Sequence, residues 1–225
     1  MSHHKIDPLK KVTLSDMVAE KLRELIVQGA YKEGEQLNEL ELASRFNVSR
    51  GPVREGLRQL VHAGLLRSEP HRGAFVAELT EEDFADIHRA REVVEAAAIN
   101  DIIDDGRHAA VAAALLKLTQ SMQRAFAARE WSRLADLISR FHTELVRGSG
   151  SHRLARMYSS LIDEARICLR LTMGEPDASL VEAHVKIAEL LASGDRQGTL
   201  DALVGFRREP ITSAGHASAG GRGSA

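Results

Sequence analysis

The sequence predicts a mostly α-helical protein in which three helices and a short β-hairpin are followed by a bundle of about six helices. Three observations lead to this fold class. Apolar residues recur at helical spacing through most of the 225 residues. Only 4% of the residues are aromatic, while alanine and leucine dominate, and this mix favours helix over sheet. The hydrophobic share of 44% allows a substantial core, and the length suits one large or two small domains.

Composition also narrows the class of protein. The chain carries 30 Lys+Arg against 32 Asp+Glu, so it has almost no net charge. Its single cysteine, Cys168, rules out an internal disulfide framework and fits a reducing cytoplasm, where we expect the protein to reside. The N-terminus has no apolar signal segment, and no apolar run approaches the roughly 20 residues needed to span a bilayer, so no membrane partner is expected.

The first helix is expected within residues 12–28, with Ser15 as N-cap and Gly29 at its end. Its apolar stripe comprises Met17, Val18, Leu22, Leu25 and Ile26. A loop around Gly34 follows. Asn38 then caps a short second helix over 39–46, whose inward residues are Leu42, Ala43 and Phe46.

A third helix is expected to begin near Arg50, with Ser49 as its cap and Pro52 in its first turn, where a missing N–H costs little. Its buried stripe is Val53, Leu57, Leu60 and Val61. Gly56 is unusual, because a glycine inside a helix costs roughly 1 kcal/mol relative to alanine. After Gly64, two short strands are expected around a tight turn at Arg72 and Gly73.

The character of the sequence changes after residue 78. Thr80 and Asp83 have the spacing of a capping box that opens a long helix with Phe84, Ile87, Val94, Ala98 and Ile102 inward. Further helices are expected over 108–129, 131–147, 151–173, 179–193 and 196–208, which together make an all-α bundle. We therefore expect an N-terminal domain over 1–78, a helical domain over 79–208 and a disordered Gly/Ser/Ala-rich tail over 209–225.

The third helix carries arginines at positions 50, 54 and 58, one turn apart. From Arg45 to Arg72 the chain holds six arginines and two acids, an excess of four positive charges. Two short helices followed by a hairpin make a winged helix-turn-helix, whose second helix enters the DNA major groove. Arg50 and Arg54 then suit guanine edges, and Ser49 suits a phosphate. The alternative is a solvated charged face.

The stretch "LASRFNVSRGPVREGLRQLVHAGLLRSEPHRGAFVAEL" resembles the winged helix-turn-helix of the GntR family of bacterial transcription regulators. The family pattern is close to "LA…VSR-x-PVREAL…L…GL…RGxxV", and the clear departure is Gly56, where the family prefers alanine. The resemblance implies that double-stranded DNA is the partner. The residues expected to form or shape the DNA surface are Arg45, Ser49, Arg50, Pro52, Arg54, Arg58, Arg72 and Gly73.

Two histidines are expected to point into the bundle. His142 lies on the apolar stripe of helix 131–147, and His184 lies on that of helix 179–193. A buried imidazole needs a hydrogen bond, a metal or a ligand as partner, and two of them on different helices could converge on a polar cavity. For each histidine alone, a hydrogen-bonded core residue is the simpler interpretation.

The order of domains, and "REVVE" in the first bundle helix, are similar to the FadR-like branch of the family, whose effector domain is called FCD. Many members hold a divalent metal with "D-x-x-F-H" and two later histidines. Here "ISRFH" supplies His142 and His184 matches the next ligand, but Ile138 and Phe206 stand where an Asp and the last His are expected. A zinc or nickel ion is therefore conceivable only with an incomplete ligand set.

These residues suggest an effector pocket instead, for an acyl or aromatic carboxylate. The candidate pocket residues are Arg91, Ile138, His142, Arg166, His184 and Phe206. Arg91 has a structural alternative, an ion pair with Glu95 four residues on. The sequence thus predicts a ligand-responsive regulator, a repressor that binds a palindromic operator as a homodimer and has no catalytic residues. A metal-dependent enzyme using the two histidines and an architectural DNA binder without effector remain the alternatives.

Overall fold

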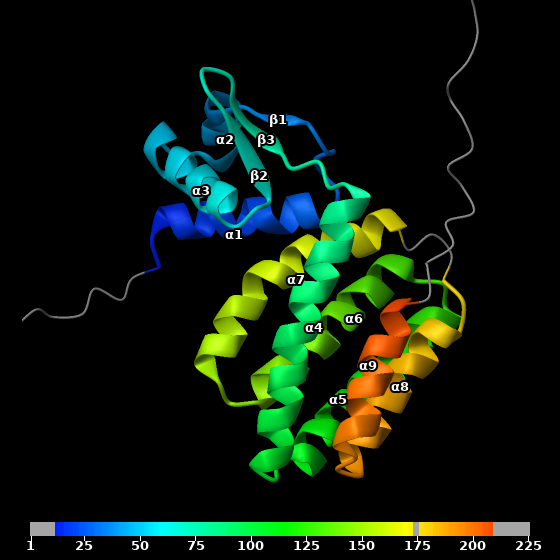
Figure 1. The fold of residues 1–225 in the computed structure, drawn as a ribbon. Helices are drawn as coiled ribbons and strands as arrows, with labels where there is room; N and C mark the ends of the chain where they lie inside the picture. Colours follow the sequence, from blue (N-terminus) through cyan, green and yellow to red (C-terminus); the bar gives the residue numbers. More distant parts are fainter. Residues whose placement is uncertain (1–11, 173–175, 209–225) are drawn as a thin grey trace, which may run out of the picture. The chain divides into compact units, whose positions relative to one another are not determined.

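The computed structural model describes residues 12–172 and 176–208, and the side chains of 170–172 and 206–208 fall outside that description. The expected tail over 209–225 lies outside the described residues as well. The chain divides into two compact units, residues 1–78 and 79–225 (Figure 1). Their described parts form a small α/β unit and an all-helical unit. This mostly α-helical architecture confirms the predicted fold class.

The first unit combines three helices with a three-stranded antiparallel sheet. The helices are α1 (Leu14–Val27), α2 (Glu39–Phe46) and α3 (Arg50–His62), and the strands are β1 (Gln36–Leu37), β2 (Leu66–Glu69) and β3 (Gly73–Val76). The sheet order is β1-β3-β2, with Leu66 paired to Val76 in the hairpin. Helix α1 packs along α3, and the hairpin follows α3 directly (Figure 1). The core gathers apolar side chains from every helix, among them Leu22, Ile26, Leu42, Val53, Leu57 and Leu60.

Several local predictions for this unit need correction. Met17, placed in the apolar stripe of α1, is exposed, and Phe46, expected inward on α2, is half-buried. Thr13, and not Ser15, caps α1, and its hydroxyl and the Asp16 carboxylate form a reciprocal capping box. Strand β1 was expected to be loop, because two residues carry no periodicity that could reveal a strand. Val61 was expected in the buried stripe of α3 but is only half-buried. The cap of α2 was predicted correctly: the Asn38 side chain accepts hydrogen bonds from the Leu40 and Glu41 amides.

The structure gives Gly56 a packing reason. This glycine is buried where α3 approaches α1. A Cβ atom built there would lie 3.1 Å from Val18 Cγ1 and 3.2 Å from both the Ala19 nitrogen and the Ser15 oxygen. Two of these neighbours are backbone atoms, so an alanine would require α1 to shift by a few tenths of an ångström. The missing side chain therefore sets how deeply α3 sits against α1.

The second unit contains α4 (Glu81–Asp104), α5 (His108–Ala127), α6 (Trp131–Gly148), α7 (His152–Thr172), α8 (Ser179–Ala192) and α9 (Arg196–Arg208). The predicted helix boundaries agree with these bounds to within two residues. Thr80 and Asp83 form the predicted capping box. No helix in the described ranges is long and apolar enough to cross a membrane.

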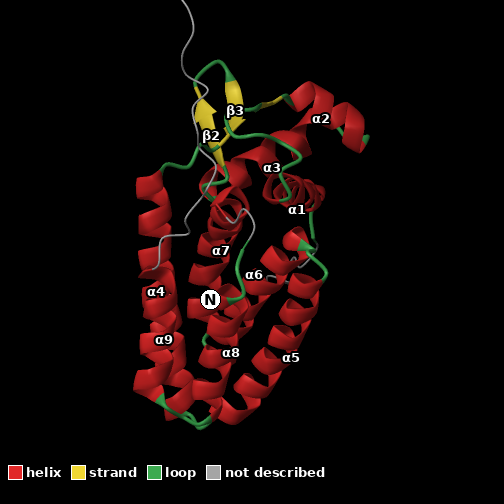
Figure 2. Ribbon diagram, turned by 90° about the vertical axis from the view of Figure 1, so that its right-hand side faces the viewer, coloured by secondary structure: helices red, strands yellow, loops and turns green. Residues whose placement is uncertain are grey.

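The helices of this unit close into a ring. Helix α4 contacts α7, and the contacts continue through α6, α5, α8 and α9 back to α4. Figure 2 shows the helices of this unit as one bundle. Helix α6 also contacts α4 across the ring. The large apolar core lies inside, built from α4, α5, α6, α8 and α9 residues such as Ile99, Leu115, Phe141, Ile187 and Leu203. The inner stripe of α6 therefore faces residues from several other helices, and His142 lies on that stripe.

Candidate functional site

Helix α3 presents its arginines outward because its apolar residues face the core of the first unit. Val53, Leu57 and Leu60 are buried, whereas the side chains of Arg50 and Arg54 are each 58% exposed and that of Arg58 is 77% exposed. Ser49 is the N-cap residue, but its side chain makes no capping hydrogen bond. Pro52 lies in the first turn as predicted. The start of α3 is therefore an exposed face with two guanidinium groups one turn apart.

Both of these arginines share one carboxylate. Arg54 donates from Nε to Glu39 Oε1 at 3.2 Å and from Nη2 to Glu39 Oε2 at 3.0 Å. Arg50 Nη2 reaches the same Oε2 at 3.3 Å. The hydrogen bond from Arg54, aided by Arg50, holds the pKa of the Glu39 carboxyl below its ordinary value. Glu39 is the first residue of α2, and the Asn38 cap fixes its backbone there.

The remaining arginines of the predicted surface also have acidic neighbours. Arg45 pairs with Glu41 at 3.5 Å, Arg58 with Glu55 at 3.8 Å, and Arg72 with Glu69. All three arginine side chains stay at least 59% exposed. Exposed pairs of this kind contribute at most about 1 kcal/mol each, because water and salt screen them. The guanidinium groups are therefore partnered but remain accessible.

The charge of the first unit as a whole differs from the charge of residues 45–72, because acidic residues outside that stretch pair with its arginines. Residues 12–78 contain nine basic residues: Lys21, Arg23, Lys32 and the six arginines from Arg45 to Arg72. The acidic residues number ten: Asp16, Glu20, Glu24, Glu33, Glu35, Glu39, Glu41, Glu55, Glu69 and Glu78. The predicted excess of four positive charges holds for 45–72, but α2 brings two carboxylates to the same arginines. The surface is therefore a set of exposed ion pairs and not an uncompensated cationic ridge.

The hairpin tip places Arg72 in solvent. Residues 70–72 form the turn, His71 and Gly73 adopt positive φ angles of 63° and 99°, and the Arg72 side chain is 68% exposed. Only glycine adopts the Gly73 conformation readily, so this residue allows β3 to begin directly after the turn. The Gln36 side chain of β1 donates a hydrogen bond to the Arg72 carbonyl and braces the tip. The tip is thus a defined projection that ends in a cation.

A second group of polar residues lies inside the helical unit. His142 and His184 converge, with 3.2 Å between their Nε2 atoms. His142 Nδ1 lies 3.0 Å from Glu95 Oε2. Arg91 Nη2 donates to Glu95 Oε1 at 3.2 Å. We call Arg91, Glu95, His142, Tyr158 and His184 the buried polar network; every member is at most 6% exposed.

Tyr158 joins the two charged members of the network. Its hydroxyl donates to Glu95 Oε1 and accepts from Arg91 Nε at 3.1 Å. The expected pair between Arg91 and Glu95 therefore exists, but it extends to both histidines. Sequence reasoning missed Glu95 and Tyr158 as members. The available signal was "REVVE", where Glu95 shares the inner stripe of its helix with Arg91, Val94 and Ala98.

The hydrogen-bond geometry restricts where protons sit. His184 Nδ1 lies 2.6 Å from the Leu180 carbonyl oxygen, so it carries a hydrogen. Burial, together with electrostatic repulsion from the neighbouring His142, lowers the pKa of His184 to about 3, and its ring is neutral with Nε2 as an acceptor. His142 Nε2 must then donate, and the contact between His142 Nδ1 and Glu95 needs one more proton. Wherever that proton resides, the charged Arg91 leaves the network with one net positive charge.

The network does not fit a metal site. Within residues 12–172 and 176–208, no group of three or more His, Cys, Asp or Glu side chains converges to hold an ion. Ile138 is buried and apolar, and a phenylalanine such as Phe206, whose side chain lies outside the description, offers no ligand atom. The two imidazoles offer a zinc or nickel ion two ligands, fewer than the three or four protein ligands such ions take.

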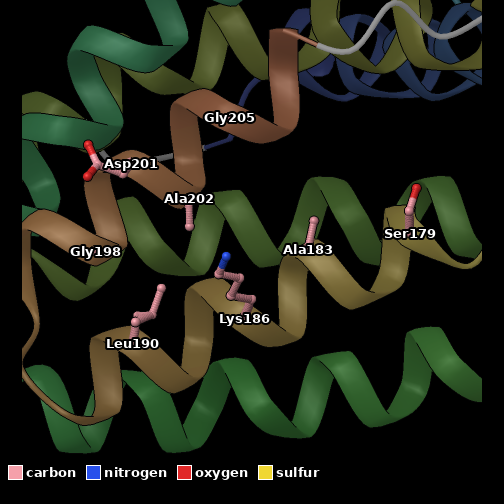
Figure 3. A pocket seen from close by; sticks show the side chains of 8 residues that line it. All are labelled: Ser179, Ala183, Lys186, Leu190, Gly198, Asp201, Ala202 and Gly205. Carbon is pink, nitrogen blue, oxygen red and sulfur yellow. The ribbon is translucent and has the colours of Figure 1, made fainter.

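The other predicted pocket residues are distributed differently. Ile138 lies one turn before His142 on the inner face of α6. Arg166, on α7, pairs with Asp136 at 2.6 Å and is partly exposed, so its described contact leads away from the histidines. A separate groove of about 440 Å³ runs between α8 and α9, lined by Ser179, Ala183, Lys186, Leu190, Gly198, Asp201, Ala202 and Gly205 (Figure 3). Among the described residues that line that groove, none is a predicted pocket residue.

Comparison with known proteins supplies the context for both groups of residues. Residues 14–76 match the family described as "Bacterial regulatory proteins, gntR family", and residues 86–205 match the "FCD domain". The chain is 27% identical to the "Probable D-xylose utilization operon transcriptional repressor" of Paenarthrobacter nicotinovorans, over 96% of each sequence. It is 33% identical to the "HTH-type transcriptional repressor GlaR" of Escherichia coli strain K12, over 64% of this chain and 67% of that one.

A solved structure supports the same fold. McbR/YncC of E. coli superposes with a TM-score of 0.74 at 22% identity, covering 87% of this chain and 94% of the other. At that identity the likeness concerns the fold alone. Since the match covers most of both chains, the folds of both units have counterparts in that one protein.

Proposed function

Since this chain belongs to the GntR family of bacterial regulatory proteins and carries an FCD domain, we propose that it represses transcription by binding a palindromic operator as a homodimer, under control of a small carboxylate effector. That it is a DNA-binding transcriptional regulator and not an enzyme follows from the family itself. The operator, the dimer and the effector are the parts that we propose. A DNA target also implies that the protein works in the cytoplasm.

The proposal for DNA recognition rests on one observation, the pair of exposed guanidinium groups at the start of α3. The N-terminal residues of a recognition helix reach base edges in the major groove, where arginine binds guanine O6 and N7 with two hydrogen bonds. We assign Arg50 and Arg54 to bases. We assign Ser49, Arg45 and Arg58 to phosphates, and Arg72 at the hairpin tip to the minor groove or a phosphate.

A dimer and a palindrome follow from the size of the reading surface. One winged unit with two base-reading arginines distinguishes few base pairs, and a two-fold dimer doubles that number. Selection of duplexes from a random 40-base-pair library by the purified full chain tests this. We expect an inverted repeat to be enriched, with half-sites about one helical turn apart. Enrichment of a single half-site would contradict the dimer. Enrichment of no sequence would favour an architectural DNA binder.

The buried polar network is our candidate for the effector site. It has one net positive charge inside an apolar core, and Arg91 and His142 already bind a carboxylate, that of Glu95. We propose that an effector carboxylate exchanges with Glu95 for these two partners. Since the network joins α4, α6, α7 and α8, such an exchange would favour a different packing of the helices and so couple the effector to DNA affinity.

A thermal-shift panel of acyl and aromatic carboxylates tests the effector proposal, with His184→Gln as the variant and an uncharged amide of each compound as control. We expect at least one carboxylate, and not its amide, to raise the melting temperature of the wild type and to alter its affinity for the selected operator. Stabilisation that survives unchanged in His184→Gln would place the ligand elsewhere. No response to any carboxylate would overturn the effector class.

A further inference from the structure

Glu39 lies where it can act on both proposed base-reading arginines at once. Its carboxylate accepts from Nε and Nη2 of Arg54 and from Nη2 of Arg50, at 3.0 to 3.3 Å. No acidic residue of α3 itself makes these contacts: the acid within α3, Glu55, lies beside Arg58. The anchoring carboxylate therefore comes from a different helix, which is fixed in turn by the Asn38 cap. This arrangement ties the two arginines to the helix-turn-helix frame.

The contacts leave the arginines able to bind DNA. A guanidinium group has five N–H donors, and Glu39 engages the Nε and Nη2 side of Arg54. The end of the fork, formed by Nη1 and the second hydrogen of Nη2, points away from that edge and retains the geometry for two parallel hydrogen bonds to guanine. Holding one edge also removes rotamer freedom that an unrestrained arginine would lose on binding.

The same carboxylate opposes binding that does not depend on sequence. Phosphate contacts dominate non-specific affinity, and they require free positive charge. Glu39 cancels one of the two charges at the start of α3, and a phosphate there must compete with it. A guanine edge carries no net charge, so it can bind the fork while the ion pair to Glu39 persists.

From these three observations we infer that Glu39 is a positioning residue for sequence discrimination: it orients Arg50 and Arg54 toward bases and excludes phosphates from them. The inference rests on the proposed base contacts of these two arginines. It assigns the acidic residue of the surface a part in recognition, although acids weaken attraction to DNA in general.

The test compares Glu39→Gln with Glu24→Gln, using the full chain. Glu24→Gln is the matched control, because it also removes one negative charge from the same unit. The partner of Glu24 is Lys21 on the surface of α1. The probes are the duplex selected by the wild type and a scrambled duplex of equal composition, titrated at several salt concentrations. Melting temperatures confirm that both variants fold.

We expect Glu39→Gln to bind the scrambled duplex more tightly and to lower the ratio of selected to scrambled affinity about tenfold, the discrimination of one arginine–guanine pair. For the scrambled duplex, the slope of the logarithm of the binding constant against the logarithm of the salt concentration should become steeper by about one, which corresponds to one more released counterion. Glu24→Gln should change the ratio less than twofold. An unchanged ratio in Glu39→Gln, or an equal change in Glu24→Gln, would overturn the inference. If the wild type selects no sequence, the proposed base contacts of Arg50 and Arg54 are wrong, and this inference fails together with them.

Discussion

The two units use the same chemistry in opposite surroundings. In the first, Arg50 and Arg54 share the carboxylate of Glu39 at the surface. In the second, Arg91, Tyr158 and His142 share the carboxylate of Glu95 in the interior. Water and salt screen the surface cluster, so a nucleic acid can compete for its arginines at small cost. Water screens the interior cluster far less, so removing Arg91 or Glu95 leaves a buried charge without its partner.

The difference teaches that a carboxylate paired with arginine can have either of two roles, depending on whether the pair is exposed or buried. At the surface, the carboxylate partners two arginines that stay exposed, and we propose that it tunes their charge for DNA. In the core it joins residues of several helices, and under our proposal a ligand replaces it by supplying an equivalent anion. Three predictions test this contrast, from the largest expected effect to the smallest.

Removing the buried charge should have the largest effect. We expect Glu95→Gln to lower the free energy of unfolding by about 3–5 kcal/mol, because Arg91 and His142 lose the carboxyl group that partners both of them inside the core. Urea unfolding followed by circular dichroism measures this. The matched change at the surface, Glu39→Gln, should cost no more than about 1 kcal/mol. Similar losses for the two variants would show that burial does not distinguish the clusters.

Removing a surface arginine should affect binding and leave stability unchanged. We expect Arg54→Ala to reduce affinity for the selected duplex by about 10- to 100-fold and to relax the base preference at one position of each half-site. A repeat of the random-library selection with the variant reports the lost position. Arg133→Ala, in an exposed pair with Glu130 of the helical unit, is the control. If the variant selects the same sequence as the wild type, Arg54 does not contact a base.

The smallest effect should come from pH. Because the pKa of His184 is lowered to about 3 from 6.5, the unfolded chain takes up a proton below pH 6.5 that the folded chain does not. Stability is therefore full above pH 6.5 and falls by about 1.4 kcal/mol per pH unit below it. Between pH 7 and 5.5 we expect a loss of about 1 kcal/mol at this site, measured by urea unfolding, and a correspondingly flatter profile in His184→Gln. An equally steep profile in that variant would assign the loss to other groups.

Local patterns in the sequence were sufficient for much of this structure. Two helix starts were predicted from residue type and spacing, at Asn38 and at Thr80 with Asp83. The apolar stripes predicted that His142 and His184 lie on the inner faces of their helices. Such signals act over four residues or fewer, so they can be read along the chain. The same holds for the outward position of Arg50 and Arg54.

Contacts between distant elements could not be read in this way. Glu39 lies 15 residues before Arg54, and Tyr158 lies 63 residues after Glu95, so nothing local links them. Strand β1 exists because its two residues pair with β3, far along the chain. Arg166 was assigned to the pocket for its charge, yet its position on α7 brings it to Asp136. Tertiary packing decided each of these cases.

The closed circuit of helices in the second unit has a mechanical consequence. A row of helices with two free ends could absorb an inserted molecule by letting an outer member swing away. Here every helix has a neighbour on both sides, and α6 also contacts α4 across the ring, so a gap opened beside one helix must move at least one other. A ligand carboxylate inserted among these helices would therefore change the packing of more than one of them.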